Sequence, residues 1–311
     1  MVERVPLLEV NNLKQYFRIN RKYSVKAVDG ISFKIFPQET YGLVGESGSG
    51  KSTTGRTIIR LYNPSEGEIY FAGHNISGKL NKEEEKHLRI NMQMIFQDPM
   101  ACLNPRKKVN EIIAQGLRIH NLCKSEAEIN EKVKQILLKV GLSAEHATRF
   151  PHQFSGGQRQ RIGIARALIM NPKLIIADEA ISALDVSIQA QVVNLMKDLQ
   201  KELGTTYLFI AHDLSMVKYI SDRIGVMHLG HIVETGTTDE IFHNPIHPYT
   251  KSLLSAIPHP NPLIEKTRIA LSYDKDDEGV DYNVAEVHHL SETHQVLATK
   301  EEFDRWNKNN N

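Results

Sequence analysis

The stretch Gly45-Glu46-Ser47-Gly48-Ser49-Gly50-Lys51-Ser52 decides the fold of this chain. It matches G-x-x-x-x-G-K-[ST] without a mismatch, follows an apolar run and precedes a helical run that begins at Thr53. This is the strand–loop–helix context of a phosphate-binding loop, in which backbone N–H groups and the positive end of a helix converge on phosphate oxygens. Lys51 would reach the outer phosphates, and the Ser52 hydroxyl would bind Mg²⁺. A glycine-rich structural turn, the alternative, has no need of Lys51. The sequence therefore predicts a nucleoside triphosphate site at residues 45–53.

A cluster of polar side chains at strand ends completes the predicted site. One apolar run ends in Asp178 and Glu179, and another ends in His212. Asp178 would orient a water molecule of the Mg²⁺ ion, and Glu179 would polarise the attacking water as a general base. Alone, these residues have ordinary readings as helix-start acids and a packed histidine. Beside the phosphate loop they lie where nucleotide folds bind ligands, and we expect Lys51, Glu179 and His212 to be catalytic.

A second glycine motif, Phe154-Ser155-Gly156-Gly157-Gln158, opens another helical run. Serine and glycines at a helix start form an anion site, yet one nucleotide needs only one cradle within a subunit. The economical explanation is that this loop caps a nucleotide held by another subunit. One alternative is a stand-alone P-loop kinase, in which the loop at residues 154–158 would have no role.

Composition excludes several other classes of protein. The chain has 311 residues, 24% of them charged and 41% hydrophobic, which is typical of a globular protein and not of a disordered one. The net charge of +1 provides no general basic field for nucleic acid. The N-terminal residues lack the apolar core of a signal peptide, and no uncharged run reaches the roughly 18–20 residues of a membrane span. We therefore expect a cytoplasmic protein.

The order of the sequence patterns predicts an α/β fold. Short β-like runs occupy the first 75 residues or so, and helical patterns follow to about residue 170, including a helix that Ser125 and Glu128 would cap. A strand, a helix that ends at Gly204 and a further strand then imply a parallel sheet. Two last runs read as a hairpin that turns at Leu229-Gly230. The expected strands are 7–10, 31–35, 41–44, 68–71, 174–177, 207–211, 224–227 and 231–234.

The composition changes after Pro258, where prolines and then the acidic run 274–281 follow. We expect a main domain at residues 1–260 and an appendage at residues 261–311. Thr299 and Glu302 would cap a short final helix in this tail.

In this order and at this spacing the motifs resemble those of the ATP-binding cassette (ABC) family, over residues 1 to about 257. The phosphate loop and the signature loop match residues 45–52 and 154–158, with Phe154 in place of the usual leucine. The glutamine loop matches Gln97, the D-loop matches Ser182-Ala183-Leu184-Asp185, and the switch histidine matches His212.

The resemblance implies a P-loop NTPase fold with a RecA-like core and parallel sheet, an antiparallel β subdomain and a helical signature subdomain at about residues 98–168. It implies that Gln97 binds Mg²⁺ and senses the transmembrane partner, and that His212 contacts the γ-phosphate. It also implies that Asp185, which follows Ala183 and Leu184 in the D-loop, crosses a dimer interface. The metal set would be Ser52, Gln97 and, through water, Asp178. The aromatic residue that stacks on adenine aligns best with Phe17, while Tyr16 and Tyr23 remain open.

A finer resemblance, carried by residues 96–106 and 247–258, is to the oligopeptide/dipeptide importer branch. The tail at residues 296–303 resembles the F-type ATPases of oligopeptide permeases. This implies a peripheral motor on the cytoplasmic face of the membrane. Its partners would be a related D-type ATPase in a heterodimer, two permease subunits and an extracellular substrate-binding lipoprotein. Import of dipeptides, nickel or another small solute, and a soluble non-transport ABC ATPase, are the alternatives. The tail lacks the cysteines that hold an iron–sulfur cluster in many relatives, and Cys102 and Cys123 lie outside it, so no such cluster is expected.

Overall fold

The computed structural model describes residues 4–258, 271–273, 280–282 and 284–308. The domain boundary expected near residue 260 and most of the acidic run 274–281 lie outside the described residues. None of the described helices combines the length and the apolar character needed to cross a membrane.

The centre of the molecule is an eight-stranded sheet in the order β11-β12-β10-β9-β3-β8-β7-β6. The five strands from β9 to β6 are parallel, and the remaining three pair antiparallel. Every residue of β3, β7 and β8 is buried, as expected for parallel strands covered on both faces. The strands are β3 (Thr40–Val44), β6 (Met92–Ile95), β7 (Leu174–Asp178), β8 (Thr206–Ile210), β9 (Arg223–His228), β10 (His231–Thr237), β11 (Glu286–His289) and β12 (Gln295–Ala298).

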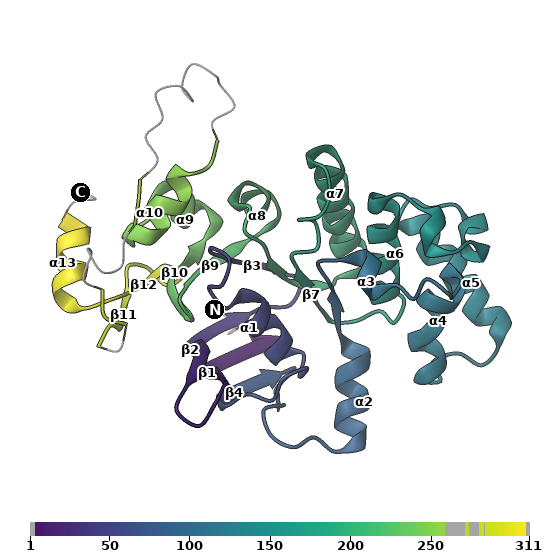
Figure 1. The fold of residues 1–311 in the computed structure, drawn as a ribbon, viewed down its shortest axis with the longest axis horizontal. Helices are drawn as coiled ribbons and strands as arrows, with labels where there is room; N and C mark the ends of the chain where they lie inside the picture. Colours follow the sequence, from purple (N-terminus) through teal and green to yellow (C-terminus); the bar gives the residue numbers. More distant parts are fainter. Residues whose placement is uncertain (1–3, 259–270, 274–279, 283, 309–311) are drawn as a thin grey trace.

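A separate four-stranded antiparallel sheet has the order β2-β1-β4-β5 and lies beside the core in Figure 1. Its inward side chains, among them Leu8 and Ile69, share one hydrophobic cluster with Leu43 and Leu208 of the core sheet. The antiparallel sheet is therefore packed directly on the core sheet. Its strands are β1 (Leu8–Arg18), β2 (Ser24–Ile35), β4 (Glu66–Phe71) and β5 (His74–Asn75).

Helices fill the middle of the chain and form the end of the molecule opposite the tail (Figure 1). Ser125 caps α5 as predicted, but the Glu128 carboxylate accepts the N–H of Lys124 and not that of Ser125, so the reciprocal bond falls one residue early. These helices are α3 (Pro99–Cys102), α4 (Val109–Ile119), α5 (Glu126–Lys139), the 3₁₀ turns η1 (Ala144–Thr148) and η2 (Pro151–Gln153), and α6 (Gly156–Leu168).

The remaining helices flank the sheets, and α7 ends at Gly204, whose φ of 66° matches the predicted stop. The β9–β10 hairpin also turns as predicted, with φ of 44° at Leu229 and 88° at Gly230. The helices are α1 (Lys51–Ile58), α2 (Lys82–Asn91), α7 (Val186–Leu203), α8 (Leu214–Ile220), α9 (Thr238–His243) and α10 (Pro248–Ser255).

The tail contributes two strands that the sequence patterns did not indicate. Strand β12 pairs antiparallel with β10, β11 pairs with β12, and the hairpin thereby widens the core sheet. The final helix α13 (Lys300–Lys308) begins at the predicted cap, where Thr299 and Glu302 exchange backbone-to-side-chain hydrogen bonds. Its Trp306 is buried against His247. The described part of the tail is therefore packed on the core.

Candidate nucleotide site

The phosphate loop joins β3 to α1, and its glycines are required by close backbone contacts. A Cβ atom on Gly45 would lie 2.0 Å from the carbonyl oxygen of Met227, and one on Gly50 would lie 2.2 Å from that of Ala27. Both residues also have positive φ, 149° and 106°. The loop borders a cavity of about 460 Å³. The cavity is lined by Val25, Lys26, Ala27, Ser47, Gly48, Gly50, Lys51, Ser52, Thr53, Gln97, Glu179, Leu229 and Gly230.

Lys51 lies inside this loop. Its Nζ donates to the carbonyl oxygens of Gly45 at 2.8 Å and Glu46 at 2.7 Å. Burial lowers the pKa of Lys51, and the nearby carboxylates of Glu179 and Asp178 oppose that shift. The loop thus holds a cation at its centre, where phosphate oxygens of a nucleotide would meet it.

The Ser52 hydroxyl donates to Oδ1 of Asp178 at 2.6 Å, which joins the start of α1 to the end of β7. Asp178 is almost fully buried, and Arg56 lies 3.3 Å from its other oxygen. The hydroxyl and carboxylate predicted to share a metal ion are therefore adjacent.

Glu179 lies where three strand ends meet. Its Oε2 accepts a hydrogen bond from Nε2 of Gln97 at 2.8 Å and lies 3.9 Å from Nδ1 of His212. Gln97 follows β6, Glu179 follows β7 and His212 follows β8, which are neighbouring strands of the sheet. Glu179 has a φ of 46°, a left-handed conformation that costs energy in a residue with a side chain and is found at functional sites.

The signature loop forms a tight helix start. Ser155 accepts the N–H of Gln158, and Gln158 accepts the N–H of Ser155 at 3.0 Å, which closes a capping box. Phe154 is buried and makes an edge contact with His146, so the aromatic ring that replaces leucine fills the helical core. Ser155 itself is exposed.

The signature loop and the D-loop adjoin each other. A Cβ on Gly156 would lie 3.6 Å from Leu184, and Ala183 and Asp185 beside it are exposed. No residue of 154–158 or 183–185, all of them within the described part of the chain, lines the cavity at Lys51. The two anion sites that the sequence predicted are therefore separate in one subunit.

The candidate aromatic residues differ in their surroundings. Phe17 is half-buried against Tyr62 and pairs across β1 and β2 with Val25, which lines the cavity. The Tyr16 hydroxyl donates to Asp29, while Tyr23 is 69% exposed. This arrangement favours Phe17, since residues that pair across strands share one face of the sheet.

Two hydrogen bonds that hold the phosphate loop in place were not predicted from the sequence. The N–H of Gly230 donates to the carbonyl of Ser49 at 3.0 Å, and the N–H of Glu46 donates to the Tyr249 hydroxyl at 2.9 Å. The Leu229-Gly230 turn was recognised as a hairpin, but no local pattern places it against residues nearly two hundred positions earlier.

The strand, glycine loop and helix at Lys51 define the chain as a nucleotide-binding protein of the P-loop class. A family model described as ABC transporter matches residues 28–182, and one described as the C-terminal region of oligopeptide/dipeptide transporters matches residues 233–279. The chain belongs to the ABC transporter family of ATPases.

Named relatives and a solved structure agree with this membership. The chain is 59% identical to the oligopeptide transport ATP-binding protein OppF of Streptococcus mutans, over 98% of each chain. It is 52% identical to the dipeptide transport ATP-binding protein DppF of Lactococcus lactis, over 99% of each. A solved dimeric ATP-binding cassette with ADP and Pi is 28% identical, with a TM-score of 0.68 over 74% of this chain and 98% of that chain. The resemblance to the ABC family and its expected fold are confirmed.

Proposed function

We propose that the chain is the ATP-hydrolysing motor subunit of an ABC importer for oligopeptides, and that it couples ATP binding and hydrolysis to peptide uptake through membrane permease subunits. The observation that carries the proposal is the 59% identity to OppF of Streptococcus mutans over 98% of this chain, tail included. A soluble ABC ATPase that acts on ribosomes or DNA would usually need a second cassette in the chain. The sequence contains a single phosphate-loop pattern and carries a net charge of only +1.

Each residue described in the candidate site would have one role in ATP binding or hydrolysis. Lys51 and the N–H groups of the loop would bind the β- and γ-phosphates, and Phe17 would stack on adenine. Glu179 would take a proton from the attacking water, and His212, 3.9 Å from its carboxylate, would contact the γ-phosphate. The Gln97 amide, bonded to the same carboxylate, would orient it toward that water.

ABC ATPases use ATP with Mg²⁺, and the donor set here fits that ion. The hydroxyl of Ser52 and the carboxylate of Asp178 are 2.6 Å apart at the mouth of the phosphate loop. Oxygen donors of this kind are those that Mg²⁺ prefers. We propose that Ser52 and Gln97 hold the ion directly and Asp178 through water. When bound, it would neutralise charge that develops on the phosphate oxygens.

We further propose that two related cassettes pair head-to-tail, each capping the other's nucleotide with residues 154–158. The separation of Ser155 from the cavity at Lys51 supports this pairing, because a loop that faces solvent in one subunit is available to the next. The partner would be a D-type ATPase. The pair would lie on the cytoplasmic face of the membrane, against two permease subunits served by an extracellular substrate-binding lipoprotein, and would need no nucleic acid.

Reconstitution tests the proposal. The chain is copurified with its membrane complex, its partners are identified by mass, and the complex is placed in vesicles with the binding protein. We expect ATP-dependent uptake of a labelled oligopeptide that stops when Lys51→Ala is substituted. Uptake of a dipeptide or of Ni²⁺ in its place would move the substrate to another solute of the same branch. Isolation of the chain with ribosomes and without membrane subunits would contradict the proposal.

A further inference from the structure

A tyrosine outside the recognised motifs holds the phosphate loop. The hydroxyl of Tyr249, in α10, accepts the backbone N–H of Glu46 at 2.9 Å. Tyr249 is 2% exposed and its ring packs on His228 with centroids 4.2 Å apart. Burial raises the pKa of Tyr249 to about 12, so the phenol stays neutral. The second residue of the loop is thus tied to a helix more than two hundred residues later.

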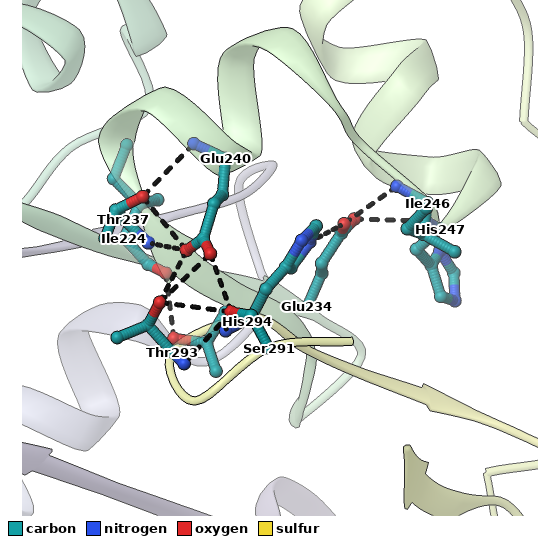
Figure 2. A network of polar contacts seen from close by, with 10 residues as sticks. Ile224, Glu234, Thr237, Glu240, Ile246, His247, Ser291, Thr293 and His294 are labelled. Carbon is teal, nitrogen blue, oxygen red and sulfur yellow. Dashed lines mark hydrogen bonds and ion pairs between the residues drawn. The ribbon is translucent and has the colours of Figure 1, made fainter. Parts of the chain in front are cut away.

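The start of α10 is itself fixed by a buried carboxylate. Glu234 of β10 accepts the N–H of Ile246 at 2.8 Å and that of His247 at 3.1 Å (Figure 2). The His247 ring then caps α10 by accepting the N–H of Tyr249 at 3.1 Å. The backbone around Tyr249 is therefore placed by Glu234.

The tail completes this arrangement. Nε2 of His294 lies 2.8 Å from Oε1 of Glu234, and the side chains of both residues are at most 3% exposed. Figure 2 shows Glu234 between His294 on one side and the backbone of Ile246 and His247 on the other. Nearby, Ser291 and Thr293 of the same tail turn bond to Glu240 of α9 and fix the turn in place.

From this geometry we propose that Tyr249 is a positioning residue for the phosphate loop, and that the tail sets its position through His294 and Glu234. The tail thereby controls nucleotide affinity at Lys51. The inference rests on the proposed ATP-binding function. It adds to it a specific route from residues 291–294 to Glu46.

The physical argument concerns the conformations open to the loop. Without an acceptor, the N–H of Glu46 loses the bond that favours the cradle conformation, and a nucleotide must select that conformation from a wider set. A bias of the size of one hydrogen bond corresponds to about 2- to 13-fold weaker binding. Removing His294 leaves the Glu234 carboxylate with one partner fewer and loosens the backbone before Tyr249. The loss of His294 therefore weakens the same hydrogen bond, the one between the N–H of Glu46 and the Tyr249 hydroxyl.

The test measures binding of a fluorescent, non-hydrolysable ATP analogue with Mg²⁺ to the full-length chain and its variants. We expect Tyr249→Phe and His294→Ala each to weaken binding, and the double variant to bind no more weakly than Tyr249→Phe alone. His294→Gln, which keeps a side-chain donor for Glu234, should restore affinity. Amide hydrogen exchange at Glu46 should accelerate in Tyr249→Phe, a change that general loss of stability would not confine to this residue.

Tyr70→Phe is the matched control, because it removes a hydroxyl that donates to the exposed Glu68 in the antiparallel sheet. It should bind like the wild type. Wild-type affinity in Tyr249→Phe would overturn the positioning role. Wild-type affinity in His294→Ala, or effects that multiply in the double variant, would overturn the route through the tail. Failure of the unsubstituted chain to bind the analogue would instead contradict the proposed function.

Discussion

The side-chain amide of Gln97 donates to the carboxylate of Glu179, with 2.8 Å between Nε2 and Oε2. The two residues follow β6 and β7, adjacent parallel strands, so the bond crosses from one strand end to the next. A movement of the segment after β6 would therefore change the orientation of the carboxylate directly. If that segment meets the permease, as the family resemblance implies, a single hydrogen bond links the membrane partner to the proposed general base.

Glu179→Gln should retain nucleotide binding and lose hydrolysis. The amide cannot take a proton from water, yet it still offers an oxygen to Gln97, and Lys51 and Asp178 are untouched. Loss of a general base lowers a rate by about 10²–10⁴-fold. Single-turnover ATP hydrolysis in the assembled complex measures the change, with each of the two sites assayed separately. Glu131→Gln, on the exposed face of α5, is the control. A full hydrolysis rate at this chain's own site would place the base elsewhere.

Phe17→Ala should weaken ATP binding by about 1–3 kcal/mol, the usual worth of an aromatic ring stacked on a base. Tyr23→Ala should change binding little, because Tyr23 is 69% exposed and packs little against the rest of the protein. Titration of both variants with ATP and with a triphosphate that lacks a base separates stacking from phosphate contacts. Only the ATP curve should shift. The opposite order of effects would assign the stacking role to Tyr23.

Ser155→Arg should disable the nucleotide bound to the partner's phosphate loop and spare binding at this chain's Lys51. A bulky cation at an exposed helix start would block the approach of the partner's triphosphate. Purified alone, the chain should be largely monomeric and hydrolyse ATP slowly. Light scattering measures the oligomeric state of the isolated chain. Site-specific nucleotide trapping in the complex shows which of the two sites the substitution disables. Transport by a complex that contains only this cassette would contradict the heterodimer.

His247→Asn should flatten the dependence of stability on pH. Burial, with a smaller contribution from His228, lowers the pKa of His247 to about 3, from an ordinary value near 6.5. As pH falls below about 6.5 the unfolded chain binds a proton that the folded chain excludes. The contribution of His247 to the free energy of unfolding is thus fully present above pH 6.5. Between pH 6.5 and about 3 it decreases by about 1.4 kcal/mol per pH unit. Asparagine still caps a helix.

Denaturant unfolding at pH 7, 6 and 5 tests this expectation. The free energy of unfolding should fall less steeply in His247→Asn than in the wild type, whatever the difference between the two proteins at pH 7. Parallel curves would mean that another group takes up the proton.

Short-range patterns predicted the nucleotide core because its geometry is local. The loop from Gly45 to Ser52 adopts one conformation between a strand and a helix, and glycines appear where a Cβ would meet backbone atoms. The turn at Leu229-Gly230 and the stop at Gly204 were visible for the same reason, since each depends on positive φ at a few residues.

Other features depended on contacts that the sequence does not display. Strand β6 is only four residues, Met92–Ile95, and such a short run, which Gln93 interrupts, is not distinguishable from part of a helix. Strands β11 and β12 gain stability from β10, so no strong pattern of their own was needed. The bond between Tyr249 and Glu46 joins residues 203 positions apart, and only the fold brings them together.

The tail hairpin also determines which edge the core sheet exposes. β12 pairs with Glu234 and Thr235 on the outer side of the seven-residue β10, and the outermost strand, β11, has only four residues. A short edge strand presents few unpaired backbone N–H and C=O groups to another chain, whereas a long uncovered edge strand is a template for self-association. A fragment that ends before β11 would leave β10 uncovered and would form strand-paired aggregates. Such aggregates would be mistaken for cassette dimers, so studies of assembly require the full-length chain.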